Sequence, residues 1–330
     1  MEGSKYNLKI QKYITALAIL LFIIKMTAWW LTQSVAILTD ALESTVNVAA
    51  ALLGLYSLYV SAKPRDKEHP YGHGKVEFIS SAVEGTAISI AGLYIIYEAV
   101  QGLINPKPVT ALDKGIILVT VTAIINYAAG YYCIKTGRKN KSLVLVAGGK
   151  HLQSDAYTTI GIVAGLILLM ITKIWWIDAV LAIIFSVVII HTGVKIIRES
   201  IAGIMDEADE ALLKQMVEVL NSKRRINWID LHNMRIIKYG PKMHIDVHMT
   251  MPWYFNINEA HHEVDELCEL VNSKFSELVE IDVHNDGCLP ANCPICHKGD
   301  CPVRQALWQK TIHWTPENVR QNSKHDINTV

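Results

Sequence analysis

The sequence predicts an all-α bundle of six transmembrane helices followed by a small α+β domain in the cytosol. The first observation is composition, since 51% of the 330 residues are apolar and the mean hydropathy is positive. The second is distribution, because the apolar residues form long runs before about residue 200 and thin out after it. The third is the pattern beyond that point, where short amphipathic and alternating segments follow in the order helix, strand, strand, helix, strand.

Six apolar segments are long enough to cross a bilayer, which takes about 20 residues in a helix. They are expected at residues 13–31, 35–60, 78–104, 115–134, 143–171 and 175–197. The polar start of the chain and the missing small-residue cleavage site indicate a first membrane helix and not a removed signal. Lysine and arginine are concentrated on one set of loops, which predicts that both termini and the chain after residue 200 face the cytosol.

The predicted organisation is therefore a six-span membrane domain at 1–200, a cytosolic α+β domain at 201–287 and a cysteine-containing tail at 288–330. In the αββαβ domain, helices are expected at 211–222 and 258–275, and strands at 228–237, 242–250 and 277–284, with a turn at 239–241. The polar chain after Cys301 is expected to be an interaction tail or partly disordered. The formal net charge of zero gives no sign of a nucleic-acid partner. No catalytic arrangement is visible, so an enzyme is not expected.

Two pairs of polar residues lie inside predicted spans, where ionisable groups are costly and usually functional. Glu43 and Asn47 are four residues apart in the second span, and His151 and Asp155 are four apart in the fifth. This spacing places each pair on one face of its helix. If the two faces meet, four oxygen and nitrogen ligands can surround one ion, a donor set that suits zinc and neighbouring first-row metals. The alternative is that each pair only bonds a neighbouring helix or caps a helix end.

Other polar residues of the spans are expected to form hydrogen bonds within the bundle: Lys25, Asp40, Glu84, Glu98 and Asn126. Asp40 lies one turn before Glu43, so it is a candidate to support the ligands or to pack helices.

Three segments resemble the cation diffusion facilitator family of divalent metal transporters. SVAILTDALESTVN at 34–47 looks like its second-helix motif, KHLQSD at 150–155 looks like the HxxxD motif of its fifth helix, and DKEHPYGHGKVE at 66–77 looks like its loop between helices two and three. The match runs in order from about residue 10 to residue 287. The resemblance implies a proton-coupled antiporter that exports a divalent metal ion from the cytosol by alternating access. It also implies a homodimer with a metallochaperone-like cytosolic domain. The short loop between the fourth and fifth spans favours the bacterial type, in the inner membrane.

The resemblance maps the transport site to Glu43, Asn47, His151 and Asp155. The zinc pattern of the family usually has two aspartates, or histidine and aspartate, where this chain has Glu43 and Asn47. Zinc is the first expectation because His151 is a nitrogen ligand, and iron, manganese, cobalt and cadmium stay open.

The resemblance implies further metal sites outside the spans. The loop site would use Asp66, His69 and His73, although these histidines could also be solvated. The cytosolic regulatory site would use five residues: His232, His248, His261, His284 and Asp286. His244, Asp246 and His262 lie nearby in sequence and are candidate competing ligands. Lys75 and Asp206 match a charge pair at the dimer junction of the family.

The tail carries four of the six cysteines in one short segment, Cys288, Cys293, Cys296 and Cys301, with His297 among them. Thiolates and an imidazole at this spacing can close a tetrahedral zinc site, and iron or copper are alternatives. The segment is interpreted either as a regulatory metal trap or as a structural knot that holds the tail. For the whole chain, the rival hypothesis is a membrane-anchored metal sensor that does not transport.

Overall fold

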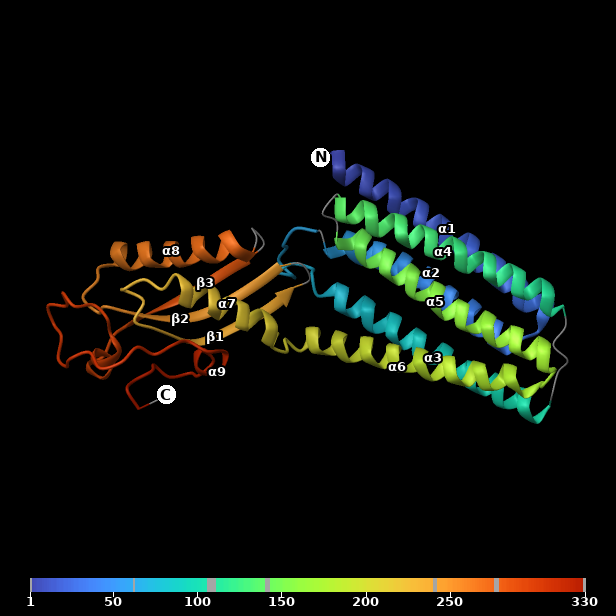
Figure 1. Cartoon of the computed structure of the whole chain (residues 1–330). Helices are drawn as coiled ribbons and strands as arrows, with labels where there is room; N and C mark the ends of the chain where they lie inside the picture. Colours follow the sequence, from blue (N-terminus) through green and yellow to red (C-terminus); the bar gives the residue numbers. More distant parts are fainter. Residues whose placement is uncertain are drawn as a thin grey trace. The chain divides into compact units, whose positions relative to one another are not determined.

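The computed structural model describes residues 2–61, 63–105, 111–139, 143–239, 242–275 and 279–328 (Figure 1). The chain separates into two compact units. The first contains Met1–Tyr59 and Ile79–Ile201, and the second contains Val60–Phe78 and Ala202–Val330. The loop between the second and third helices thus belongs to the same unit as the α+β domain. Gly240 and Pro241 of the expected turn lie outside the described residues.

Long helices make up the first unit. They are α1 (Glu2–Thr32), α2 (Val35–Ser61), α3 (Val76–Ile104), α4 (Leu112–Lys139), α5 (Leu143–Thr172) and α6 (Trp176–Ile204). In the described part of the chain, five helices are long and apolar enough to cross a membrane, all except α2. A helical membrane domain is therefore confirmed, and the sixth crossing by α2, which has 27 residues, stays a prediction.

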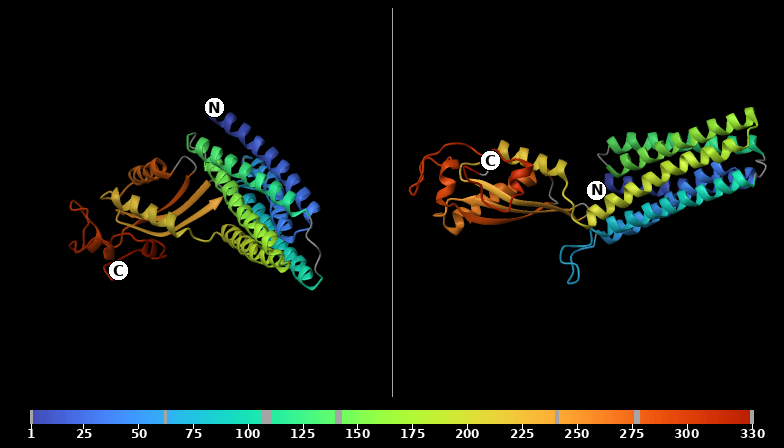
Figure 2. Two further views of the ribbon diagram at one scale, coloured as in Figure 1. Left: turned by 45° about the vertical axis from the view of Figure 1, so that its right-hand side comes forward. Right: turned by 90° about the horizontal axis from the view of Figure 1, so that it is seen from below.

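Small residues let the membrane helices approach closely, as is common where lipid surrounds a bundle. A Cβ atom at Gly85 of α3 would lie 2.8 Å from the carbonyl oxygen of Gly193 of α6. A Cβ atom at Gly130 of α4 would lie 2.6 Å from the carbonyl oxygen of Gly149 of α5. Both helix pairs run side by side in the two sets of views (Figures 1 and 2). Any larger residue at these glycines would push the helices apart.

The second unit is built on a three-stranded sheet. Its elements are α7 (Glu210–Ser222), β1 (Asp230–Tyr239), β2 (Lys242–Met251), α8 (Ile257–Phe275) and β3 (Val279–Gly287). The strand order is β1-β2-β3, with β1 antiparallel and β3 parallel to β2. The apolar stripes of α7 and α8 pack with one face of the sheet in a single core. The other face is left to alternate polar residues of the strands.

The tail is part of the second unit and packs onto its α+β domain, so the expectation of a partly disordered end is wrong for the residues that the structure describes. It contains a 3₁₀ helix, η1 (Pro290–Ile295), and a short helix, α9 (Pro316–Val319). Trp314 and Val319 are buried in the core formed with α7, and His325 is fully buried. The apolar residues occur singly between turns, and therefore the tail shows no periodicity in the sequence although it is ordered.

Replacing Trp314 by alanine is expected to destabilise the second unit by about 3–5 kcal/mol, the usual cost of removing a buried tryptophan. Its side chain is 1% exposed, its backbone exchanges hydrogen bonds with Asn221 of α7, and the Arg224 guanidinium lies 4.0 Å from its ring centre. Thermal unfolding of the full chain in detergent measures the effect. Trp308→Ala is the control because Trp308 is 49% exposed. A loss in Trp314→Ala as small as that in Trp308→Ala would show that the buried Trp314 side chain does not support the core.

Candidate metal centres

The polar pairs of α2 and α5 face each other across one cavity. The Asn47 amide donates a hydrogen bond of 2.9 Å to Asp155 Oδ2, and His151 Nε2 lies 3.9 Å from the same oxygen. A cavity of about 250 Å³ is lined by all four residues of the expected transport site, Glu43 included. The structure therefore brings these residues to one place inside the helical unit.

The four residues are not drawn into a closed ligand shell. Among the described residues, Glu43, His151 and Asp155 do not form a group whose ligand atoms all lie within 4.8 Å of one another. Glu84, which the sequence suggests only as a hydrogen-bonding group within the bundle, lines the same cavity. An ion bound by all of these ligands would need Glu43 and His151 to move toward Asp155, which is buried.

Two polar residues that the sequence suggests as hydrogen-bonding groups of the bundle form a buried ion pair with each other. Lys25 Nζ of α1 lies 2.9 Å from Asp40 Oδ1 of α2, and both side chains are almost fully buried. The Thr159 hydroxyl of α5 donates a 2.7 Å hydrogen bond to the same carboxylate oxygen. Asp40 thus joins three helices one turn from Glu43. The signal was present, because a lysine in the middle of a span requires a buried partner.

A second long-range contact fixes the start of α2. Asp178 of α6 accepts hydrogen bonds from the Ser34 hydroxyl at 2.5 Å and from the Val35 backbone N–H at 2.7 Å. A carboxylate at a helix N-terminus satisfies backbone donors that have no partner within the helix. No local sequence signal could have linked residues so far apart in the chain.

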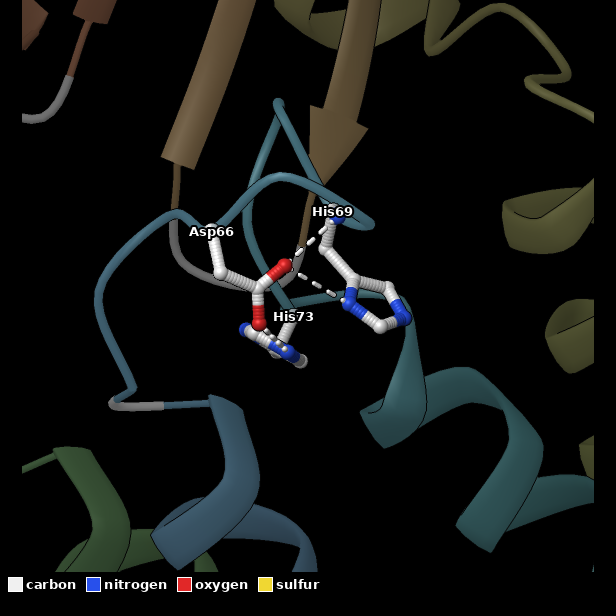
Figure 3. Close-up of side chains that lie close together, drawn as sticks. All are labelled: Asp66, His69 and His73. Carbon is white, nitrogen blue, oxygen red and sulfur yellow. Dashed lines mark hydrogen bonds and ion pairs between the residues drawn. The ribbon is translucent and has the colours of Figure 1, made fainter.

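The loop residues Asp66, His69 and His73 form a compact group, with one ligand atom of each lying within 4.8 Å of the others (Figure 3). Asp66 Oδ1 lies 3.1 Å from His69 Nδ1, and Asp66 Oδ2 lies 3.3 Å from His73 Nε2. The His69 backbone N–H donates to Asp66 Oδ1 at 2.7 Å, which lowers the pKa of the Asp66 carboxyl. The carboxylate is therefore ionised near neutral pH, the form that binds a metal ion.

The charge pair of Lys75 and Asp206 is present in the second unit, with Lys75 Nζ 2.9 Å from Asp206 Oδ2. Each side chain is about one-third exposed. A pair of this kind contributes little to stability, so its role would be to hold the loop end in place.

Three residues of the expected cytosolic site meet on the polar face of the sheet: His232, His248 and Asp286. Asp286 Oδ2 lies 3.3 Å from His232 Nε2 and 3.3 Å from His248 Nδ1. His284 is adjacent, since its ring centre is 4.5 Å from that of His248. His261 is not brought into the group. It lies on α8 with 72% of its side chain exposed and pairs with Asp265 at 3.8 Å.

The tail reaches this cytosolic group through Lys324 and His325. Lys324 Nζ lies 3.1 Å from Asp286 Oδ1, and His325 Nδ1 lies 2.5 Å from Asp230 Oδ1, beside His232. Burial alone would raise the pKa of Asp286, but Lys324 and the two histidines outweigh it and hold that pKa below its usual range. Lys324 therefore places a tethered positive charge on a candidate metal ligand.

Replacing Lys324 by alanine is expected to tighten metal binding at His232, His248 and Asp286. A partly exposed ion pair is worth up to about 1 kcal/mol, so the dissociation constant should fall by as much as roughly 5-fold. Competition with a zinc chelator, using the full chain in detergent, measures this change. Lys298→Ala is the control because Lys298 pairs with Asp300 instead. Unchanged or weaker binding in Lys324→Ala would contradict the proposal that Lys324 competes with the metal ion for Asp286.

The four tail cysteines are free thiols, and Arg304 binds backbone carbonyls of the segment that contains them. The Arg304 guanidinium donates to the carbonyl oxygens of Cys293, Cys296 and Lys298 at 3.1, 2.9 and 2.7 Å. Burial raises the pKa of the Cys288 and Cys296 thiols. Among the described residues, the cysteines do not form a group with ligand atoms within 4.8 Å of one another. His297 faces Thr311 and Trp308.

A helical membrane domain with a polar cavity, joined to a small domain rich in imidazole and carboxylate groups, defines the class of membrane proteins that handle metal cations. Residues 12–205 match the model of the cation efflux transmembrane domain, and residues 208–288 match that of the cytoplasmic domain of cation efflux proteins. The chain belongs to the cation diffusion facilitator family, whose members are metal cation exporters. The tail lies beyond both matched regions.

Relatives support this assignment over most of the chain. An uncharacterized transporter of Synechocystis sp. is 30% identical over 256 residues, which cover 78% of this chain and 81% of that protein. The cation-efflux pump FieF of Salmonella newport is 27% identical over 279 residues, covering 83% of this chain and 90% of the pump. The chain is thus a multi-pass membrane protein of a transporter family and not of an enzyme family.

Proposed function

We propose that this protein exports a divalent metal ion from the cytosol in exchange for protons, with zinc as the first expectation. The observation that carries the proposal is the cavity between α2 and α5, lined by Glu43, Asn47, His151 and Asp155. A carboxylate, an imidazole and an amide around a confined space suit zinc, and also iron, manganese, cobalt or cadmium. A relative, FieF of Salmonella newport, is by its name a cation-efflux pump.

Transport proceeds by alternating access. The ion enters from the cytosol when the site is deprotonated, because carboxylate and imidazole bind metal only without their protons. Outward opening exposes the site to protons, which compete for the ligands and release the ion. Asn47 has no titrating group, so proton exchange rests on Glu43, His151 and Asp155. Histidine is the natural exchanger, since its ordinary pKa is about 6.5.

The other groups serve this function in the proposal. The protein works as a homodimer with six spans per chain in a bacterial inner membrane, and both termini are cytosolic. Metal bound at the loop site and at the cytosolic histidines biases the dimer toward one state. His261 and His284 complete the cytosolic site when two chains meet. The cysteines of the tail, 288, 293, 296 and 301, hold a further zinc, iron or copper ion that pins the loop or regulates transport.

Metal uptake into proteoliposomes under a pH gradient tests the function, with zinc, iron, manganese, cobalt and cadmium compared. The wild type is expected to transport at least one of these ions, and the order of rates identifies the substrate. His151→Ala is expected to flatten the dependence of the rate on pH near neutrality. An unchanged pH profile in this variant would remove His151 from proton exchange. No flux of any ion, with metal still bound by the second unit, would favour the membrane-anchored sensor.

A further inference from the structure

The parallel pairing of β2 and β3 builds a continuous row of metal-binding side chains on one face of the sheet. Directly paired residues are His244 with Glu280, Asp246 with Asp282, and His248 with His284. The residues between them, Ile245, Val247, Ile281 and Val283, belong to the core on the opposite face. Since successive strand residues point to opposite faces, the ligand residues all project from the polar face.

Three of these residues form a group separate from the cytosolic group described above. His244 Nε2 lies 3.1 Å from Asp246 Oδ1 and 3.4 Å from Asp282 Oδ2, and one ligand atom of each residue lies within 4.8 Å of the others. His244 Nδ1 is 3.8 Å from a carboxylate oxygen of Glu280. The His244 side chain is 12% exposed, and its Nδ1 atom is buried without a hydrogen-bond partner. The group thus has an imidazole held between carboxylates.

The charges in this row are unbalanced. Asp246 and Asp282 are direct partners across the two strands, and two like charges in this position repel each other. Glu280 forms an ion pair with Arg65. Arg235 of β1 is the register partner of Asp246, but its guanidinium donates a hydrogen bond to Asn233. Within the ranges that the structure describes, no lysine or arginine forms an ion pair with Asp246 or Asp282. A bound cation would turn this repulsion into attraction, which accounts for two facing aspartates beside a histidine.

We propose that His244, Asp246 and Asp282 form a divalent-cation site of their own. On β2 and β3 this site lies nearer the start of each strand than His248 and Asp286. The proposal does not depend on the transport function proposed above. One imidazole and two carboxylates make a donor set richer in oxygen than the two imidazoles and one carboxylate of the neighbouring group. This set favours ions such as manganese and iron(II), together with zinc, over ions that prefer thiolates.

The site is in contact with the loop between α2 and α3. The Tyr71 ring stands edge-on to His244, with ring centres 5.8 Å apart, and stacks on Tyr239 at 5.5 Å. Glu280, beside His244, is paired with Arg65 of the same loop. An ion at His244 therefore binds where the sheet contacts the loop that carries Asp66, His69 and His73. Binding of the ion is expected to stabilise the contact between this loop and the sheet.

The experiment uses Mn²⁺ as the probe because its bound and free forms are distinguished by electron paramagnetic resonance. The full chain in detergent is titrated, and wild type is compared with the double variant Asp246→Asn/Asp282→Asn. The matched control is Glu218→Gln/Glu269→Gln, which removes the same charge from exposed positions on helices that cover the opposite face. His232→Ala/Asp286→Asn separately disables the neighbouring group.

The Asp246→Asn/Asp282→Asn variant is expected to lose one class of bound Mn²⁺, or to bind it at least about 10-fold more weakly. Loss of a group that only supports a ligand has a cost of this size in other metal sites. The charge control should bind as wild type does, and the His232→Ala/Asp286→Asn variant should retain this class. His244→Ala should show the same loss. Without metal, the asparagine variant should unfold at the wild-type temperature or higher, and it should lose the rise in that temperature that Mn²⁺ gives the wild type. Wild-type binding in this variant, or an equal loss in the charge control, would overturn the proposal.

Discussion

Replacing Asp155 by asparagine is expected to reduce the rate of metal transport by at least about 100-fold. Removing a residue that only supports a ligand usually reduces metal affinity or activity by less than this. Asp155 is the only residue of the α2–α5 cavity that contacts two others of the expected site, Asn47 at 2.9 Å and His151 at 3.9 Å, among the contacts the structure describes. Asparagine keeps the shape and one acceptor oxygen, so the bond from Asn47 can persist. What is lost is the negative charge that binds the ion and later accepts a proton.

The initial rate of metal uptake into proteoliposomes, normalised to the reconstituted protein, measures this effect. Glu199→Gln is the matched control, because Glu199 is a carboxylate on α6 whose side chain is 68% exposed and whose partner is Lys195. Its rate should equal that of the wild type. A rate for Asp155→Asn close to that of this control would mean that the ion crosses by a route that does not use the cavity.

Replacing Lys25 by methionine is expected to destabilise the protein by about 3–5 kcal/mol, the cost of leaving one member of a buried ion pair without its partner. The Asp40 side chain is 1% exposed and, among the contacts of the described residues, would keep only the hydrogen bond from Thr159. Methionine has a similar length, so the packing of α1 against α2 and α5 changes little. The loss therefore reports the uncompensated carboxylate.

The double variant Lys25→Met/Asp40→Asn separates charge from packing. A neutral amide can still accept the Thr159 hydrogen bond, so most of the lost stability should return. Thermal unfolding in detergent measures both variants, with Lys195→Met as the control because Lys195 is 69% exposed. If Lys25→Met behaves like Lys195→Met, or if the double variant is no more stable than Lys25→Met, the buried pair is not a source of stability.

Local patterns in the sequence were sufficient to locate the helices and strands of the second unit. The expected helix at 211–222 is α7 at Glu210–Ser222, and the expected helix at 258–275 is α8 at Ile257–Phe275. The expected strand at 242–250 is β2 at Lys242–Met251. These features depend on periodicity within one element, which the sequence displays directly.

Contacts between distant segments could not be read in the same way. The Lys25–Asp40 pair, the Asp178 cap of α2 and the Lys324–Asp286 pair each depend on which helix faces meet and on how the tail folds back. The tail was misjudged for the same reason, since its buried residues follow turns and have no period. The facing aspartates 246 and 282 depend on the register of parallel strands, which one strand alone does not reveal.

The location of the bound substrate ion is the most direct test of the central claim. Anomalous X-ray scattering at the zinc edge, from crystals of the full chain grown with zinc, would place each ion among the side chains. The account predicts zinc in the α2–α5 cavity, about 2.0–2.2 Å from a nitrogen of His151 and an oxygen of Asp155, with Glu43 drawn toward it. Zinc confined to the second unit, with none in the cavity at saturating metal, would contradict it.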